Sequence, residues 1–379
     1  MESGFQIQTP CDESDAIEPS RLNPTAPYMS FLNDGYHPGN NMPPPVSVTH
    51  EIRFESARNE ADDPVITPNF HYVAMRTSDT SFEVWDVERR VQHRFDLGNF
   101  GPSVGLAAMS SDGRFIAVAL DNSDNETRVW RVDDGLQVAS FHTPFEVAGI
   151  ALTAEGREIA LSGSVPVPDE AAREDSDDEE ADLHQWNHCY VTIRHVHTGR
   201  VVRSLEFFSK FVSEVRFSRS DRILSIDASP ARIWKWDAGQ VFVCPDRNCN
   251  QPVLNPADDG VVATTWGQGG EAVSRWRDWA KGAAVPLWLD KEANLEQGYL
   301  PRFSDDGSAL VYLTREREIR RAFWGLGDGF ETIVRLDADI STFAVDSRGI
   351  LVAVAYESEV LALILNPMRA CGGRVVRNR

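Results

Sequence analysis

The chain has 379 residues, of which 42% are hydrophobic and 25% charged, a composition typical of a globular protein with a substantial core. Its formal net charge of −21 disfavours a nucleic-acid backbone as the main partner, because such binding depends on Lys and Arg side chains that neutralise phosphates. We find no signal-peptide pattern and no apolar run approaching the roughly 18 residues of a membrane span. We therefore expect neither nucleic acid nor membrane as a partner.

The cysteines are odd in number and scattered along the chain, which is not the pattern of a secreted disulfide framework. We expect a reducing environment and hence a cytoplasmic or nuclear protein. The five cysteines are Cys11, Cys189, Cys244, Cys249 and Cys371.

Residues 1–46 differ in composition from the rest of the chain. They contain eight prolines and show no sustained period of 2 or 3.6 residues. Such a segment buries too little apolar surface to offset the entropy lost on ordering, so we predict a disordered Pro-rich tail.

From about residue 47 the sequence repeats, and residues 104–141 form the clearest unit. Four short apolar runs alternate with polar turns such as Ser110-Ser111-Asp112-Gly113 and Asp133-Asp134-Gly135. Gly and Asp suit the backbone geometry of tight turns, so the unit predicts four strands joined by turns.

The first of these turns recurs six times, and its copies are separated by 44, 43, 65, 39, 47 and 42 residues. The one long interval contains an acidic insertion around residues 165–187. Four strands every ~40–45 residues are typical of a β-propeller, so we predict an all-β, seven-bladed β-propeller of four-stranded antiparallel blades over residues 47–379. The turns end at Asn69, Gly113, Gly156, Asp221, Gly260, Gly307 and Gly349.

A column of tryptophans has the same phase, at 16, 17, 13, 16 and 17 residues after its turns. These residues are Trp85, Trp130, Trp234, Trp276 and Trp324.

The residues that carry the repeat resemble those of the WD-repeat family. Trp85-Asp86 closes one predicted strand and Trp234-Lys235-Trp236-Asp237 closes another, while the Ser-Asp-Gly turns match the turn between the first two strands of a blade in that family. The chain departs from the family pattern, because no Gly-His dipeptide precedes a blade and Arg131 follows Trp130. The resemblance implies a propeller whose usual polar network is mostly lost, so we expect its blades to depend on apolar packing.

The boundaries of the repeat do not determine which strand completes the ring. Either Arg374–Arg377 supplies the last strand, or Val48–Phe54 crosses over to complete the seventh blade. The predicted blades are 47–98, 104–141, 147–208, 212–243, 253–290, 298–336 and 340–378.

The acidic insertion in the third blade carries nine Asp and Glu residues within residues 169–182, against the single cation Arg173. Like charges at this density repel one another, so we predict a disordered loop. Ser176 is followed by Asp177-Asp178-Glu179-Glu180, which resembles the acidophilic casein-kinase consensus. Phosphorylation would add negative charge and could engage a basic partner; the alternative is a loop that only aids solubility.

Two groups of residues suggest metal binding only weakly, and we predict no metal and no cofactor. The Cys244–Cys249 spacing has no second pair nearby, and the histidine spacings match no standard zinc pattern. The histidine group comprises His184, His188, Cys189, His195 and His197.

The sequence contains no G-x-S-x-G, P-loop or H-E-x-x-H motif, so we predict a non-enzymatic scaffold that binds other proteins through its propeller faces, as a monomeric propeller within a complex. The alternative is a substrate receptor of a cullin-type ubiquitin ligase, although Arg89 stands one place late for the Trp-Asp-x-Arg motif of that class. A propeller hydrolase or lyase is the third hypothesis.

We predict that an acidophilic kinase phosphorylates Ser176 in the purified protein. Phosphopeptide mapping of the treated protein should place one phosphate at this position, and the Ser176→Ala variant should lack it. Full coverage of the insertion with no modified serine would refute the assignment.

Overall fold

In the computed structural model every regular element of the described residues is a β-strand. The structure describes residues 46–54, 65–67, 72–78, 81–86, 89, 91–96, 104–120, 125–167, 187–244, 249–255, 260–267, 270–277, 286–290, 301–304, 307, 309–314, 318–323, 330–335, 340–345, 351–357 and 359–367.

The strands form seven four-stranded antiparallel sheets. The first contains β2 (Val65–Ile66), β3 (Tyr72–Ser78), β4 (Ser81–Asp86) and β5 (Val91–Asp96). The second contains β6 (Val104–Met109), β7 (Phe115–Leu120), β8 (Glu126–Arg131) and β9 (Gln137–His142). The third contains β10 (Glu146–Leu152), β11 (Glu158–Pro166), β12 (Asn187–His195) and β13 (Val201–Ser209).

The remaining sheets follow in chain order. The fourth contains β14 (Val212–Phe217), β15 (Ile223–Ala228), β16 (Arg232–Lys235) and β17 (Gln240–Val243). The fifth contains β18 (Cys249–Leu254), β19 (Gly260–Gly267), β20 (Gly270–Arg277) and β21 (Pro286–Asp290). The sixth contains β22 (Arg302–Phe303), β23 (Ala309–Leu313), β24 (Glu318–Phe323) and β25 (Phe330–Arg335). The last contains β26 (Ile340–Val345), β27 (Leu351–Glu357), β28 (Glu359–Pro367) and β1 (Val46–Phe54).

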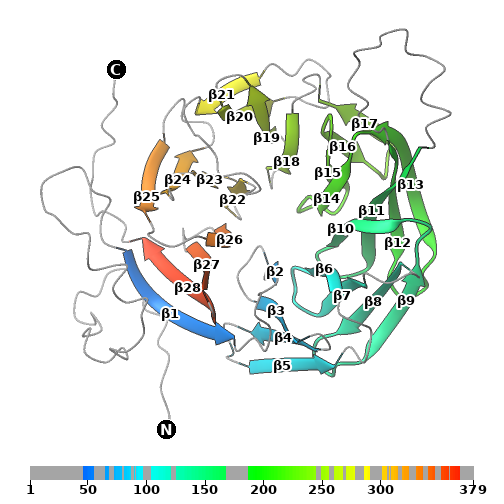
Figure 1. Ribbon diagram of the computed structural model, residues 1–379, viewed down its shortest axis with the longest axis horizontal. Coiled ribbons are helices and arrows are strands. Elements are labelled where there is room, and N and C mark those ends of the chain that lie inside the picture. The colour runs from blue at the N-terminus through cyan, green and yellow to red at the C-terminus, as the bar shows by residue number, and fades with distance from the viewer. Residues whose placement is uncertain are drawn as a thin grey trace, which may run out of the picture.

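These sheets are arranged in a ring, with the first strand of each nearest the centre and the last at the rim (Figure 1). Neighbouring sheets contact each other through their inner strands, as β6 does with β10 and β10 with β14. The arrangement is that of a β-propeller, so the predicted all-β fold is confirmed.

The ring is closed by the N-terminal strand rather than by the C-terminal stretch. β1 pairs antiparallel with β28, from Val46 opposite Pro367 to Phe54 opposite Val360. Of the two closures left open by the sequence, the structure has the crossover, and the first sheet accordingly begins at β2. Residues 374–377 and the tail up to residue 45 lie outside the described residues.

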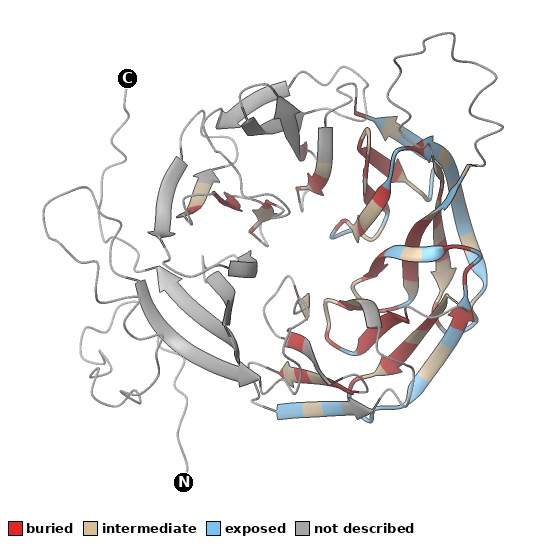
Figure 2. Cartoon of the chain, viewed as in Figure 1, coloured by how far each residue is buried: buried red, intermediate tan, exposed pale blue. Residues whose placement is uncertain are grey.

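The core lies between neighbouring sheets, where inner strands such as β7 are buried on both faces (Figure 2). All six residues of β7 are buried, and they alternate between two clusters. Ile116 and Val118 pack with Phe82 and Val84 of the first sheet. Ala117 packs with residues of the third sheet, including Ile159 and Leu161.

A buried hydroxyl organises the turn between the first and second strands of several sheets. The Ser110 Oγ accepts a hydrogen bond from the Phe115 amide at 3.0 Å and donates to the Phe115 carbonyl at 3.3 Å. The same five-residue arrangement recurs at Thr67, Thr153 and Ser304. In these four turns the hydroxyl is buried, so it and the backbone groups satisfy one another's hydrogen bonds.

Three residues after that hydroxyl, the backbone adopts a positive φ. Gly113, Gly156 and Gly307 do so at φ 70, 66 and 71°, as their position in the repeat predicts, and Asp221 takes the same place at φ 58°. The amide of each donates back to the turn's first carbonyl at 2.8–2.9 Å. A left-handed conformation is unfavourable for most residues but tolerated by Asp, which explains why this copy folds without glycine.

Hydrogen bonds also link the turns of adjacent sheets. The Asp112 amide donates to the Ala154 carbonyl at 3.0 Å, and the Ala154 amide donates to both carboxylate oxygens of Asp221 at 3.0 and 3.1 Å. The Asn255 side-chain amide donates to the Gly307 carbonyl at 3.0 Å. Burial raises the pKa of Asp221, while its bond with the Ala154 amide opposes the shift.

We predict that Gly156→Ala destabilises the protein more than Gly239→Ala. Both glycines have a positive φ, but a Cβ on Gly156 would lie 2.3 Å from the Phe115 ring, whereas nothing lies within 4 Å at Gly239. We expect backbone strain to lower the free energy of unfolding by about 1–2 kcal/mol in both variants. In Gly156→Ala alone, overpacking should lower it by about 1–3 kcal/mol more. Urea unfolding measures both, and equal losses in the two variants would contradict this assignment.

Candidate functional site

The topology gives the propeller two faces with different connections. The turn face carries the links between first and second strands and between third and fourth strands, such as residues 110–114 and 132–136. The insertion face carries the connections between successive sheets, such as 143–145 and 210–211, together with Pro166 and Asn187, between which the acidic segment runs. Antiparallel alternation places these two sets of connections at opposite ends of the strands.

The tryptophan column occupies the third strand of its sheets. Trp85 lies in β4, Trp130 in β8, Trp234 in β16 and Trp276 in β20, while Trp324 lies outside the described residues. Trp130 and Trp234 are buried in the clusters between sheets. Trp130 and Trp234 therefore contribute to the packing of the ring.

The other repeat markers are also structural. Asp86 is buried and accepts a hydrogen bond from the Arg89 amide at 2.7 Å, so it closes the turn after β4. The Trp236 Nε1 donates to the Asp221 carbonyl at 2.8 Å, while Asp237 is exposed in the following turn. Gly260 begins β19, and Gly349 lies outside the described residues.

The structure separates the candidate metal ligands of the third sheet. His188 and Cys189 lie at the start of β12 and His195 at its end, roughly 23 Å away at the rise of a strand. His197 lies just after the strand, with its ring 6.1 Å from that of His195. Among the described residues, no three His, Cys, Asp or Glu side chains gather in a way that could hold a metal ion.

Two of the thiols are buried. Cys189 and Cys244 form no disulfide, and burial raises the pKa of Cys189 to about 11. A thiol that stays protonated at neutral pH is a weak nucleophile and a weak metal ligand. His184 and Ser176 lie outside the described residues.

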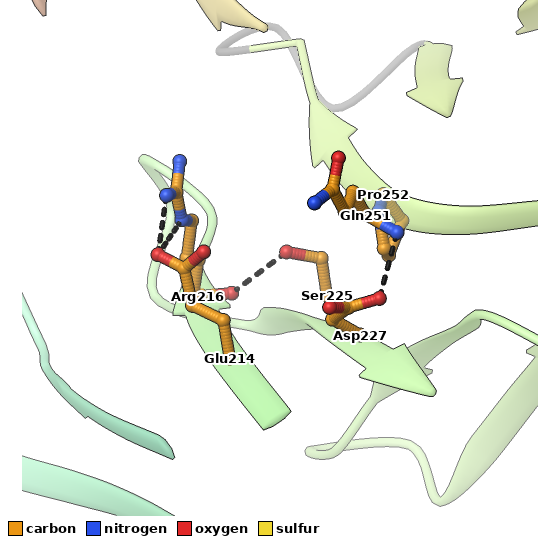
Figure 3. Close-up of a pocket in the computed structure, with 6 residues that line it drawn as sticks. All are labelled: Glu214, Arg216, Ser225, Asp227, Gln251 and Pro252. Carbon is orange, nitrogen blue, oxygen red and sulfur yellow. Dashed lines mark hydrogen bonds and ion pairs between the residues drawn. The ribbon is translucent and has the colours of Figure 1, made fainter. Parts of the chain in front are cut away.

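A small polar pocket lies between the fourth and fifth sheets, toward the insertion face (Figure 3). Its empty volume is about 150 Å³. It is lined by Glu214, Arg216, Ser225, Asp227, Gln251 and Pro252.

Asp227 is the centre of this pocket and joins the two sheets. It accepts a hydrogen bond from the Ser213 hydroxyl at 2.5 Å and one from the Gln251 amide at 2.7 Å. Burial raises its pKa, and both hydrogen bonds act against that shift. Glu214 and Arg216 form an ion pair beside it on β14. Because both carboxylate oxygens of Asp227 are already engaged within the protein, the arrangement is a structural link rather than a poised acid or base.

An aromatic ladder lies at the insertion-face end of the third sheet and consists of Phe145, Tyr190, His188 and Phe208. The Phe145 and Tyr190 rings stack with centroids 5.5 Å apart, and His188 lies 4.4 Å from Tyr190. His188 in turn stacks on Phe208 at 5.0 Å with an interplanar angle of 20°. The Tyr190 hydroxyl and the His188 Nδ1 share a hydrogen bond of 2.8 Å, which fixes the order of the rings.

The ladder changes from buried to exposed along its length. Phe145 is 2% exposed, whereas Phe208 is 58% exposed at the rim. Large apolar rings at a protein surface mark interaction sites more often than isolated aliphatic residues do. Sequence reasoning missed this feature, because its members come from three segments that only the strand pairing brings together.

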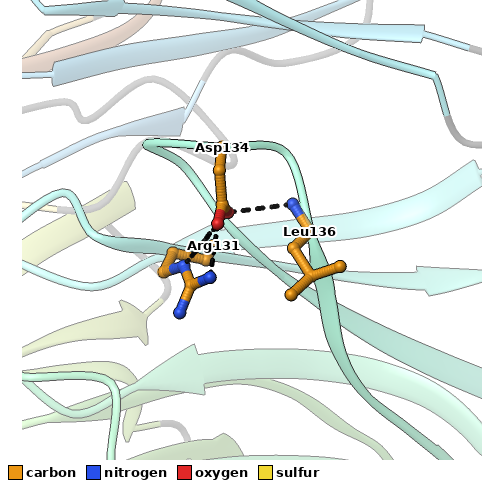
Figure 4. Close-up of polar contacts among 3 residues, drawn as sticks. All are labelled: Arg131, Asp134 and Leu136. Carbon is orange, nitrogen blue, oxygen red and sulfur yellow. Dashed lines mark hydrogen bonds and ion pairs between the residues drawn. The ribbon is translucent and has the colours of Figure 1, made fainter.

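The turn face presents a smaller feature at residues 131–136. Arg131 and Asp134 form an ion pair, and Asp134 also accepts a hydrogen bond from the Leu136 amide at 3.1 Å (Figure 4). The ion pair lowers the pKa of Asp134 and raises that of Arg131. This network holds the turn that presents Leu136, which is 56% exposed and stands apart from the aromatic ladder.

Comparison with known proteins adds no family to this fold. The chain matches no protein-family model, and no curated protein matches it. Within the described residues, no helix is long and apolar enough to cross a membrane.

We predict that Asp227→Ala lowers the free energy of unfolding by about 1–3 kcal/mol, because it leaves the Gln251 amide without its acceptor. Asp227→Asn should lower the free energy of unfolding by less, because it keeps an oxygen acceptor and removes a buried charge.

The same variants test the pKa shift. Because the folded-state pKa of Asp227 is raised, its ionisation opposes folding at neutral pH, and the wild type should gain stability relative to Asp227→Asn as the pH falls from 7 toward 3.8, the ordinary value. Urea unfolding at several pH values measures this difference, and a constant difference would exclude the shift.

Proposed function

We propose that this chain is a non-enzymatic protein-interaction scaffold built on a seven-bladed propeller of the WD-repeat type. The seven four-stranded sheets are taken as the seven blades, and the tryptophans of the third strands and the turns with positive φ support the WD-repeat assignment. Loss of the family's polar network is compensated by the apolar layers between sheets and by the buried hydroxyls of Thr67, Ser110, Thr153 and Ser304.

The observation that carries the scaffold proposal is the aromatic ladder on the insertion face. A propeller commonly acts as a rigid platform for other proteins, and exposed aromatic residues on a rigid frame are typical anchors of such contacts. In this proposal the acidic segment 168–186, which joins β11 to β12 in the sequence, attracts a basic partner protein, and phosphorylation of Ser176 strengthens that attraction.

The proposed compartment is the cytosol or nucleus. It is supported by the thiols of Cys189 and Cys244, which remain buried and unbridged. In this setting the propeller is one monomeric member of a larger complex.

Affinity purification from cells tests the scaffold proposal. The bait is the full chain, and the matched control replaces Asp and Glu within 168–186 by Asn and Gln so that length is kept. We expect the wild type to retain a set of basic proteins that the neutral variant loses, while both variants unfold at the same temperature. An identical partner list for the two baits would refute a role for the acidic segment, and the absence of any specific partner would refute the scaffold.

A further inference from the structure

We infer that the exposed end of the aromatic ladder is a docking site for arginine side chains of a basic partner protein. The inference rests on the proposed scaffold function, since it names the surface and the chemistry by which one partner is held.

The site is built by cross-strand pairing at the insertion-face end of β11, β12 and β13. Val165 stands directly opposite His188, and His188 directly opposite Phe208, so the three side chains share one face of the sheet. Val165 is 38% exposed and Phe208 58% exposed. Figure 2 shows that β13 is exposed along most of its length, so the outer strand of this sheet presents a surface at the rim.

The rings are held in place before any partner arrives. His188 is fixed from one side by the Tyr190 hydroxyl and supports Phe208 from beneath. A ligand that stacks on the open face of Phe208 therefore loses little entropy by ordering its site.

A carboxylate lies next to the exposed ring. Glu206 is two residues before Phe208 on β13, and hence on the same face of the sheet. Its Oε2 lies 3.5 Å from the His188 Nε2, and the side chain is 59% exposed. A ring face beside a carboxylate suits the planar guanidinium of Arg, which stacks on the ring and donates hydrogen bonds to the carboxylate.

The described charge next to the ring favours a cation. Glu206 is the acidic side chain on this face of β13, while Lys210 follows the strand. In the sequence, the acidic segment joins Pro166 to Asn187, the residues next to Val165 and His188.

The same strand already holds an arginine on its other face. The Arg232 guanidinium carbon lies 3.9 Å from the centroid of Phe207, and Arg232 donates to the Phe208 carbonyl at 3.3 Å. This buried contact fixes the backbone of β13 from inside and leaves the outer ring, Phe208, for a partner.

Fluorescence anisotropy with the full-length protein tests the inference. The probes are two labelled peptides of equal length, one alternating Arg with Gly and the other Lys with Gly. We expect tighter binding of the Arg peptide, because an ammonium group is more strongly hydrated and cannot stack as a plane.

Substitutions at Phe208 separate ring stacking from general apolar contact. Phe208→Leu should lower the affinity for the Arg peptide by about three- to tenfold and the affinity for the Lys peptide by less. Phe208→Trp should keep or improve the affinity for the Arg peptide. Glu206→Gln should weaken the Arg peptide as well. The matched control is Leu136→Ala, which removes an equally exposed apolar group from the turn face. Because both side chains are exposed, all variants should keep the wild-type melting temperature.

The outcomes distinguish this site from the scaffold proposal. If neutralising residues 168–186 abolishes binding of both peptides while the Phe208 variants change nothing, the acidic segment alone binds cations and the ladder site is refuted. Equal affinity for the Arg and Lys peptides refutes it too. Loss of Arg binding on Phe208→Leu with rescue by Phe208→Trp supports the site, even if the purification experiment returns no partner.

Discussion

Apolar packing between the faces of neighbouring sheets is the interaction on which this ring depends. β7 illustrates it, because its alternate side chains enter different clusters, Ile116 toward the first sheet and Ala117 toward the third. A strand buried on both faces favours apolar residues at successive positions, which is why β7 (Phe115–Leu120) is a continuous hydrophobic run instead of an alternating one. Removing one sheet would expose two apolar faces at once, so the sheets are stable only as neighbours.

The polar interactions fix the conformation of the turns and the position of each sheet within this packing. The hydroxyls of Ser110 and its counterparts satisfy backbone groups that the tight turn would otherwise leave buried without partners. Bonds between turns, such as that from the Ala154 amide to Asp221, then fix the position of each sheet against the next. The contribution of each bond is modest, but an unmatched group at these positions would be costly, and this asymmetry favours Ser, Thr and Asp at the turns.

Much of this fold could be predicted from the sequence, because it depends on local features that repeat. The glycines at 113, 156 and 307 need only a turn with positive φ, and the tryptophan column needs only a constant position in the third strand. In the first copy the structural counterpart of Ser110 is Thr67, and the predicted end of that turn, Asn69, lies outside the described residues.

The interaction features could not be predicted in the same way, because they depend on pairing between distant strands. In the sequence Asp227 is an ordinary polar residue, and its role is evident only in the structure, where the Gln251 amide of the next sheet donates to it. His188 was grouped with His195 by proximity in sequence, yet the two lie at opposite ends of β12, and the neighbours that matter to His188 are Tyr190 and Phe208. Cross-strand register is set by the whole sheet and leaves no short motif.

The two faces of the propeller differ in how strongly local structure constrains their residues. The turn face consists of repeated turns under strong local constraints, with positive-φ residues, buried hydroxyls and bonds from sheet to sheet. The insertion face carries the connections between sheets, where chain length and composition vary without disturbing the repeat. The acidic segment is inserted at such a connection in the sequence, and the exposed end of the aromatic ladder, Phe208, lies on the outermost strand of its sheet. Individual binding properties can therefore arise on the insertion face while the ring itself stays unchanged.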